Sequence, residues 1–559
     1  MNGFDAVARC LQAEGVTWMA CFPHNPLIEA AAKIGIRPIV FRQERGGINA
    51  ADGFSRQLGG ASGGSGGSGG IGVFCSQDGP GVENSFGGIA QAWGEAVPLL
   101  FLPMGAAQSQ YDIAPNFSAR QNYQHITKLA LSIDDVNRTP RELRRAFHAI
   151  RQGRPGPALV EMPADVMHRE VDESRFSYQP TRRLVSAPSP GDVRDAARAL
   201  LAAKTPLLWA GQGVLYAGAT EALRELAELA QIPVVTTMQG KSAFPDAHPL
   251  ALGSANRTAP KAVYKWLGLA DTVLAIGSGL TRTHFGLPIP SGKFLIHSTV
   301  SAEDINKDYQ VDLGLVGDAR LTLEMLIDEV KGLIGEDGRA ANTDLHADIE
   351  ATHAQWRNEW QASLSSDETP INPYRVVAEI DRALDHENSV VTHDAGSPRD
   401  QIMPFYRATT PHGYIGWGKT THLGYGIPLM MGAKLADPSK FCLNLMGDLA
   451  FGHTGTEIET AVRAQIPITS VVINNRTMGG YDEKMPVAME RYGAGNQGGD
   501  YAGMASAMGA RGIQVDDPAA IAPALLEAQR ANAEGEVVVI EIATCQYSQF
   551  SQYPELLKP

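Results

Sequence analysis

Residues 441–475 read FCLNLMGDLAFGHTGTEIETAVRAQIPITSVVINN and carry the clearest pattern in the chain. Two short apolar runs, 441–446 and 468–474, predict strands that are buried on both faces of a sheet. The helix-like stretch between them makes a strand–helix–strand unit, whose strands are parallel and usually adjacent. Asp448 and Asn475 follow these strands, 27 residues apart. We therefore expect both side chains at the same carboxyl edge of the sheet.

The chemistry of this pair is that of a magnesium site. Carboxylate and amide oxygens are the donors that Mg²⁺ prefers, and the ion usually keeps phosphate oxygens among its ligands. Free N–H groups of residues 449–452, where the chain enters the next helix, would help to hold a phosphate. Asp448 alone is equally well a turn aspartate beside an ordinary sheet edge, but its separation from Asn475 favours the metal site.

The same alternation of apolar and amphipathic runs fills the rest of the chain. It predicts α/β domains, each a doubly wound parallel sheet with helices on both faces. Polar stretches at 170–190 and 335–373 divide the chain into three such domains, at 1–170, 188–335 and 372–548. The predicted strands are 17–22, 38–41, 71–76, 98–104, 157–162, 206–210, 233–238, 272–276, 294–297, 389–392, 441–446, 468–474 and 537–542.

One segment differs from the rest of the chain. Residues 59–70 read GGASGGSGGSGG, a composition typical of a flexible linker. The segment separates a predicted helix, 46–56, from the strand 71–76, and loops in such units are normally shorter. We interpret it as an engineered loop replacement, with a natural low-complexity loop as the alternative, and exclude it from the functional argument.

Composition excludes several classes of protein. The 559 residues are 44% hydrophobic and carry 47 Lys and Arg against 61 Asp and Glu, a formal charge of −14. This charge disfavours a protein that binds nucleic acid by neutralising phosphates. The five cysteines form no CxxC pair, which disfavours a zinc site or a disulfide framework. The N-terminus lacks signal-peptide features, and the apolar run Val97–Ala107 is far shorter than the ~18 residues of a membrane helix. We expect a cytoplasmic protein.

Three further stretches complete the pattern around Asp448. They are FRQERGGINAADGFSR (41–56), THDAGSPRD (392–400) and GWGKTTHLGYGIPLMMGAK (416–434). With residues 447–475 they resemble the thiamine-diphosphate enzymes, and among these the acetolactate synthases. The signature of that family is GDG followed at a set distance by NN, and Leu449 departs from it in a minor way. Matches at 76–93, 153–166 and 232–253 extend the resemblance over nearly the whole chain outside the Gly/Ser-rich segment.

The resemblance implies a pyrimidine-binding, a central and a diphosphate-binding domain, in that order. Asp448, Asn475 and the main-chain carbonyl of Thr477 would bind Mg²⁺ that is held by the cofactor's diphosphate. The residues that would contact the cofactor are Glu44, Gly396, Ser397, Leu423, Gly447, Asp448, Leu449, Ala450, Asn475, Met478 and Gly479.

Glu44 matches the family glutamate that binds N1′ of the cofactor's aminopyrimidine ring. A carboxyl group in an apolar cleft has a raised pKa and can share its proton with such a nitrogen. Leu423 falls where the family has a bulky apolar residue that wedges between the cofactor's two rings and bends it. Taken alone, Glu44 is a first-turn carboxylate stabilised by a helix dipole, and Leu423 is a core leucine.

Polar residues near these motifs are candidates for substrate specificity. His24 and Asn25 follow the first strand, where acetolactate synthases have Gly–Gly, and predict a different substrate. His422 is a second candidate for a proton donor or a partner of a substrate carboxylate. A surface histidine, a turn asparagine and a structural histidine are the respective alternatives. Weaker candidates to line the cleft are Gln77, Asp78 and Met478–Tyr481.

The central domain bears on further cofactors. Residues 253–264 and 277–286 depart from the stretches with which acetolactate synthases bind FAD, so we expect no FAD. A CoA substrate would need a basic pocket in this domain. Arg257, Lys261 and Lys265 are candidates for it, although a solvated helix face is the favoured interpretation.

The resemblance implies decarboxylation of a 2-oxo acid with carboligation to a second carbonyl, as in acetolactate synthase. One alternative is a 2-hydroxyacyl-CoA or oxalyl-CoA-type lyase or decarboxylase, because residues 447–460 are similar to that group. A non-catalytic cofactor-binding protein is another. No GxGxxG turn with a following acidic residue supports a dehydrogenase. The family's active sites lie between the first domain of one subunit and the third domain of another, which implies a homodimer or homotetramer.

Overall fold

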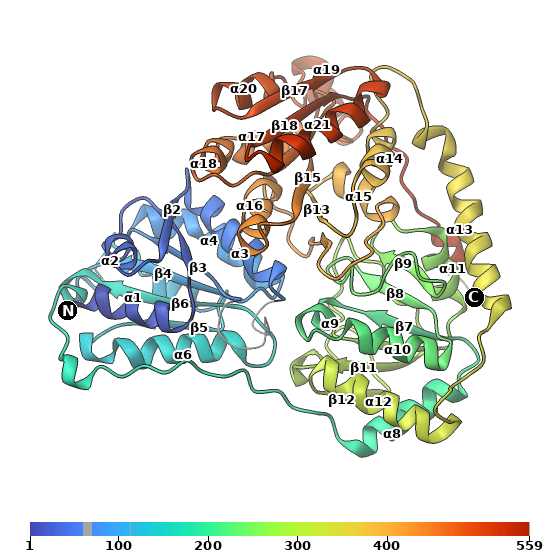
Figure 1. Cartoon of the computed structure of the whole chain (residues 1–559), viewed down its shortest axis with the longest axis horizontal. Coiled ribbons are helices and arrows are strands. Elements are labelled where there is room, and N and C mark those ends of the chain that lie inside the picture. The colour runs from blue at the N-terminus through green and yellow to red at the C-terminus, as the bar shows by residue number, and fades with distance from the viewer. Residues whose placement is uncertain (60–69, 112, 558–559) are drawn as a thin grey trace. The chain divides into compact units, whose positions relative to one another are not determined.

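The structure is a computed structural model that describes residues 1–59, 70–111 and 113–557. Most of the Gly/Ser-rich segment therefore lies outside the described residues. The chain forms two compact units. The first contains residues 1–184, 427–439 and 454–468, and the second contains the rest of the described chain. Three parallel six-stranded sheets with helices around them confirm the predicted fold class (Figure 1).

The first unit is built on the sheet β2-β1-β3-β4-β6-β5. Its strands are β1 Trp18–Phe22, β2 Arg37–Val40, β3 Gly72–Ser76, β4 Leu99–Gly105, β5 Leu129–Ser132 and β6 Pro157–Pro163. Its helices include α1 Gly3–Ala13, α2 Leu27–Lys33, α3 Glu44–Gln57, α4 Pro80–Gly94, α5 Ala119–Tyr123, α6 Thr139–Arg151, α7 Ala164–Met167 and α18 Glu457–Arg463. The helix α16, Gly426–Ala436, joins this unit from Ile427 onward.

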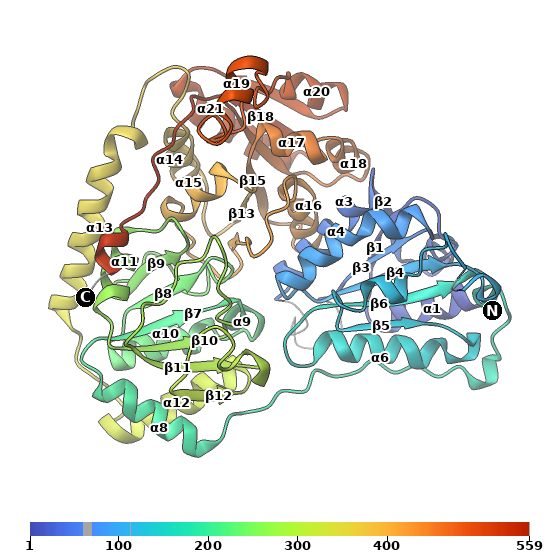
Figure 2. The same ribbon diagram turned by 180° about the vertical axis from the view of Figure 1, so that it is seen from behind.

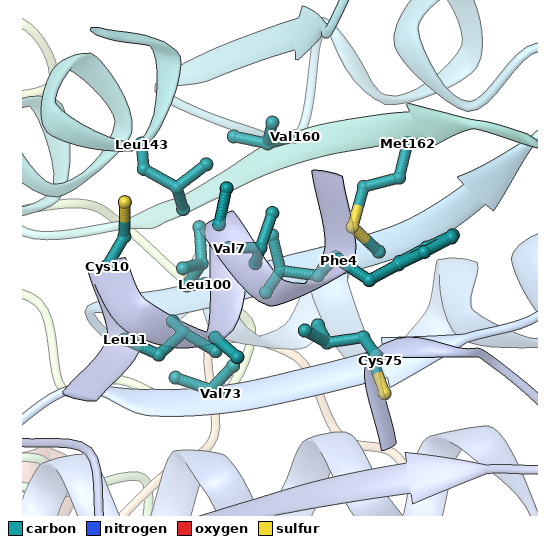
Figure 3. Close-up of a cluster of buried hydrophobic side chains, with 14 of the residues drawn as sticks. Phe4, Val7, Cys10, Leu11, Val73, Cys75, Leu100, Leu143, Val160 and Met162 are labelled. Carbon is teal, nitrogen blue, oxygen red and sulfur yellow. The ribbon is translucent and has the colours of Figure 1, made fainter. Parts of the chain in front are cut away.

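One face of this sheet packs against α1 and α6. Phe4, Val7 and Leu11 recur at helical spacing along α1 and are fully buried against strand residues such as Val73 and Leu100 (Figure 3). Burial of a side chain of this size contributes roughly 1.5–3 kcal/mol, so this cluster is a large part of the unit's stability. It holds the strands whose carboxyl ends carry the first set of functional loops.

Helix α3 lies backbone to backbone against α16. A Cβ atom on Gly53 would fall 2.0 Å from the carbonyl oxygen of Leu429, and one on Gly432 would fall 1.9 Å from that of Ala50. Only glycine allows this approach, so neither helix can slide along the other at these positions. Near the C-terminal end of α3, Ser55 accepts a hydrogen bond of 2.8 Å from the N–H of Gly72 and donates one of 2.7 Å to the carbonyl of Pro98.

The second unit holds the other two sheets. The order of the central sheet is β12-β11-β10-β7-β8-β9. Its elements are α8 Pro190–Ala202, β7 Pro206–Ala210, α9 Gln212–Tyr216, α10 Thr220–Ala230, β8 Val234–Thr237, β9 Ala251–Ala255, α11 Lys261–Leu269, β10 Thr272–Ile276, β11 Phe294–Thr299, β12 Leu313–Val316, α12 Ala319–Ile334 and α13 Thr343–Leu364. Helices α8, α10 and α12 cover one face and α11 the other, as the two views show (Figures 1 and 2).

The third sheet has the order β14-β13-β15-β16-β18-β17. Its strands are β13 Ser389–His393, β14 Tyr414–Ile415, β15 Phe441–Gly447, β16 Thr469–Asn474, β17 Arg511–Val515 and β18 Val538–Ala543. The second-unit helices around it are α14 Pro373–Ala383, α15 Ser397–Phe405, α17 Asp448–Thr454, α19 Pro486–Tyr492, α20 Tyr501–Ala507 and α21 Ile521–Ala533. None of the helices in the described part of the chain has both the length and the apolar character needed to cross a bilayer.

All thirteen predicted strands are present, within one or two residues of their expected ends. Five strands were not predicted: β5, β9, β12, β14 and β17. Every one of these lies at the edge of its sheet. Each predicted domain range contains one sheet, but α16 and α18 of the third range pack with the first unit.

Candidate functional site

The loop after β16 meets Asp448 at one edge of the third sheet. Strands β15 and β16 are parallel neighbours with Gly447 paired to Ile473, so their carboxyl ends coincide. Asp448 is 3% exposed; its Oδ2 accepts a 2.9 Å hydrogen bond from the N–H of Arg476. Asn475 Oδ1 accepts one of 3.1 Å from the N–H of Thr477. Asp448, Asn475 and Thr477, the three residues predicted to hold a metal, therefore lie after two neighbouring strands. The hydrogen bond from Arg476 to Asp448 joins these two segments.

The electrostatics of Asp448 favour a cation. Burial raises the pKa of its carboxyl group, the carboxylate of Glu541 raises it further, and hydrogen bonds from Leu449 and Arg476 only partly offset this. A bound cation would compensate such a group. Within the described residues, no three His, Cys, Asp or Glu side chains gather at one point. The available donors are thus one carboxylate, an amide oxygen and a main-chain carbonyl, which fits Mg²⁺ that completes its shell with phosphate and water.

Three segments converge beside this edge. Gly396 has φ +91°, a conformation that favours glycine, and leads into α15 without a side-chain cap. A Cβ on Gly479 would lie 3.4 Å from Ser397 Oγ, and one on Gly447 would lie 3.9 Å from the Pro398 ring. The glycines leave room where α15 and α17 begin. Helix N-termini attract anions, so this junction fits a diphosphate.

A buried aspartate that sequence reasoning missed holds the loop of Leu423. Asp394 is fully buried, and its Oδ1 accepts hydrogen bonds from the N–H groups of Ala395, at 2.8 Å, and Gly424, at 3.0 Å. Its Oδ2 accepts one of 2.8 Å from Gly426. Leu423 itself stays half-buried at the head of this turn. The Asp394 carboxylate thus fixes the position of Leu423, the predicted wedge residue, because it binds the main chain of Gly424 and Gly426.

The other end of the same loop is fixed by aromatic stacking. Trp417 lies parallel to His393, with ring centroids 4.8 Å apart, and its indole N–H donates to the His393 carbonyl at 3.0 Å. His422 is half-buried beside Leu423, and both side chains remain partly accessible. His393 and Asp394, at and just after the end of β13, therefore hold this stretch at Trp417, Gly424 and Gly426.

Glu44 is the first residue of α3 in the first unit, and it is 2% exposed. Burial raises the pKa of its carboxyl group, and a hydrogen bond with Asn84 partly offsets the effect. Among the described residues, no group hydrogen-bonds to Oε2. A buried carboxyl oxygen without a partner is rare, and it fits an acid that awaits a ligand. Sequence reasoning did not single out Asn84 as a partner of Glu44. Asn84 lies in the stretch 76–93, which resembles the family, so that motif could have indicated it.

The specificity candidates in the first unit differ in environment. His24 is exposed in the turn after β1. Asn25 is buried; its amide donates to the carbonyls of Ser76, at 2.9 Å, and Leu102, at 3.3 Å. Strands β1 and β3 pair side by side, so the turn of His24 lies at the same sheet edge as Gln77 and Asp78.

The basic residues of the central domain are largely engaged. Lys261 pairs with Glu359 at 2.5 Å and Lys265 pairs with Asp348 at 2.7 Å, both on α13. Arg257 is exposed at the start of this region. The two lysines are thus held on a helix face rather than around a pocket for an acyl-CoA.

These features fit an enzyme whose cofactor carries a diphosphate. Family models of thiamine pyrophosphate enzymes match the chain in three parts: the N-terminal TPP binding domain at 1–131, the central domain at 193–326 and the C-terminal TPP binding domain at 394–542. The chain therefore belongs to the thiamine pyrophosphate enzymes, as the sequence motifs predicted.

Curated relatives share about a quarter of its residues. A probable acetolactate synthase large subunit of Methanococcus aeolicus is 28% identical, over 94% of this chain and 90% of its own length. Glyoxylate carboligase of Escherichia coli O157:H7 is 27% identical, over 100% and 95%. Sulfoacetaldehyde acetyltransferase of Castellaniella defragrans is 29% identical, over 97% and 93%. Relatives with different reactions are thus about equally similar.

Loss of the Asp448 carboxylate should remove cofactor retention. We expect Asp448→Ala to bind thiamine diphosphate at least about tenfold more weakly, because changes even outside the ligand shell of a metal typically cost that much. Asp516→Ala, at an exposed aspartate of the same unit, is the control. The measurement is thiamine diphosphate content after desalting with Mg²⁺, and after chelation by EDTA. Unchanged content in Asp448→Ala would argue against the metal assignment.

Asp394→Asn should loosen the loop of Leu423. The amide nitrogen of Asn cannot accept the N–H that it would face, and an unmade buried hydrogen bond to a charged group costs roughly 2 kcal/mol. We expect faster hydrogen exchange in peptides that cover residues 416–426 and a lower melting temperature. Asp516→Asn should change neither. Unaltered exchange in the loop would show that Asp394 does not anchor it.

Proposed function

We propose that this chain catalyses the thiamine-diphosphate- and Mg²⁺-dependent decarboxylation of a 2-oxo acid, with carboligation of the remaining acyl unit to a second carbonyl. The observation that carries the proposal is Glu44, a buried carboxyl group with a raised pKa and an oxygen that no described residue binds. Such a group suits proton exchange with a ring nitrogen of the cofactor. The name of one relative, glyoxylate carboligase, denotes carboligation.

When bound, thiamine diphosphate supplies a nucleophilic carbon that adds to the 2-oxo acid and accepts the electron pair left when CO₂ departs. Glu44 holds and returns the proton at N1′ of the pyrimidine ring. Leu423 would wedge between the two rings of the cofactor, which is a positioning effect. Asp448, Asn475 and the Thr477 carbonyl hold Mg²⁺. Gly396 and Ser397 would contact the diphosphate, and the other residues that would contact the cofactor are Gly447, Leu449, Ala450, Met478 and Gly479.

His24 and His422 are the proposed polar contacts of the substrate. Both are accessible in part, and an imidazole can donate a proton to a carbonyl oxygen or pair with a carboxylate near neutral pH. The side-chain amide of Asn25 donates its hydrogen bonds to main-chain carbonyls, so we assign Asn25 the role of holding the turn of His24. FAD is not required in this proposal.

We further propose that the protein works in the cytoplasm as a homodimer or homotetramer. Each active site would combine Glu44 of one subunit with the metal loops of another. The resemblance to the family supports this arrangement.

A lyase or decarboxylase of 2-hydroxyacyl-CoA or oxalyl-CoA type is the second candidate. The similarity of residues 447–460 to that group favours it, whereas the pairing of Lys261 and Lys265 with α13 disfavours it. A non-catalytic cofactor-binding protein is the third possibility. It is disfavoured by Glu44, because a protein that only stores cofactor has no need of a buried acid.

A substrate screen separates these functions. CO₂ release should be measured for a panel of 2-oxo acids, with and without aldehyde or 2-oxo acid acceptors, and both CO₂ and aldehyde release should be measured with acyl-CoA substrates. We expect CO₂ release from a free 2-oxo acid, together with a hydroxyketone product when an acceptor is present. Turnover that requires CoA would establish the second candidate, and cofactor binding without any turnover would establish the third.

Glu44→Gln should bind thiamine diphosphate and lose most turnover. Gln has the size of Glu but cannot exchange a proton, and general acid–base catalysis contributes about 100-fold or more. We expect kcat to fall by at least this factor, with cofactor content after desalting unchanged. Glu83→Gln, an exposed position on α4, should behave as wild type. Full activity in Glu44→Gln would eliminate the proposed mechanism.

A further inference from the structure

The turn that leads into α3 has no cap of its own. Gln43, the residue before Glu44, is extended, and its side chain makes no hydrogen bond to the first turn of the helix. Main-chain N–H groups at the start of a helix need acceptors from elsewhere. The N–H groups of Arg42 and Gln43, which come just before the helix, find their acceptor in α18, more than 400 residues further along the chain.

Glu457, the first residue of α18, supplies that acceptor. The N–H of Arg42 lies 3.2 Å from both of its carboxyl oxygens, and the N–H of Gln43 lies 3.3 Å from Oε1. Thr460 donates to Oε2 at 2.7 Å. The Glu457 side chain is fully buried. One carboxyl group thus binds the two main-chain N–H groups that immediately precede Glu44.

The sequence of α3 leaves space for this group. A Cβ on Gly46 would fall 2.3 Å from Glu457 Oε1, so any larger residue at position 46 would displace the carboxyl group. Burial raises the pKa of Glu457 to about 7, so near neutral pH much of it is protonated. A neutral carboxyl group still has a carbonyl oxygen that accepts N–H bonds.

Other contacts between the same two segments lie at the surface. Arg42 Nε pairs with Glu459 at 2.9 Å, and Arg463 donates to the carbonyl of Val40 at 2.6 Å. Exposed pairs of this kind contribute little, typically below 1 kcal/mol. The buried bonds of Glu457 are therefore the ones that fix the turn.

We propose that Glu457 is a positioning residue for the catalytic acid, and that it sets the place and orientation of the Glu44 carboxyl group by binding the main chain at residues 42 and 43. This inference rests on the proposed role of Glu44. Glu457 itself does not touch the cofactor in this proposal. Its effect is transmitted through the two peptide groups before α3.

Three variants test the proposal. Glu457→Ala removes the acceptor, and Glu457→Gln keeps it, because the amide oxygen can accept from Arg42 and Gln43 while the amide nitrogen faces Thr460 Oγ1. Glu459→Ala removes only the exposed pair on the same helix. For each, hydrogen exchange of peptides covering residues 38–50, thiamine diphosphate content, kcat and KM are measured on the full-length protein.

We expect Glu457→Ala to exchange faster at residues 42–46 and to lose at least tenfold in kcat, with cofactor content unchanged because the diphosphate is held elsewhere. Glu457→Gln should restore both the protection and at least half of the wild-type kcat. Glu459→Ala should match wild type. Exchange at residues 42–46 that stays protected in Glu457→Ala would overturn the proposal, as would a kcat that equals that of Glu459→Ala.

The two proposals fail in distinguishable ways. If wild-type protein binds thiamine diphosphate but shows no turnover, the proposed function fails, and the exchange measurement alone decides whether Glu457 holds the turn. If wild type is active and only the exchange or kcat of Glu457→Ala is unaltered, the function stands and the positioning role fails. Gly46→Ala gives an independent check, since it should be much less harmful in Glu457→Ala than in wild type.

Discussion

Buried carboxyl groups that bind main-chain N–H groups hold three of the loops that carry the candidate site of this protein. Asp448 binds the N–H of Arg476 across two strand ends, Asp394 binds Gly424 and Gly426, and Glu457 binds Arg42 and Gln43. A carboxyl group has several acceptor sites and a fixed geometry, so one side chain can tie together loops from distant parts of the sequence. The cost is desolvation, which shows as raised pKa values at Asp448 and Glu457.

The sheets supply the frame in which these bonds form. Parallel strands end at a common edge, so residues that follow β13, β15 and β16 meet although helices separate them in sequence. Glycines at the junctions allow backbones and helix ends to approach where a side chain would collide. The result is a set of helix N-termini and loops at one sheet edge, and this is an arrangement that suits an anionic cofactor.

Much of the fold followed from the sequence, and part of what it missed has a physical cause. Interior strands such as β15 are buried on both faces and therefore read as continuous apolar runs. The strands that escaped prediction lie at sheet edges, where β5 and β17 are only partly buried and carry mixed residues. The placement of Asp448 and Glu44 was also predictable, because each lies in a motif next to a strand. Asp394 and Glu457 were not, since their partners are main-chain groups whose positions depend on the tertiary structure.

The close contact of α3 with α16 has a consequence for changes to the chain that follows α3. Gly53 and Gly432 lock the helix against its neighbour, and Ser55 ties its last turn to Gly72, the residue with which β3 begins. These contacts fix the end of α3 and the start of β3, the two points between which the Gly/Ser-rich segment runs in sequence. We therefore expect substitutions or changes of length within the segment to leave both points in place. Glu44, at the opposite end of the helix, is insulated from them, which makes this segment a suitable place to graft a tag, a sensor or a binding peptide.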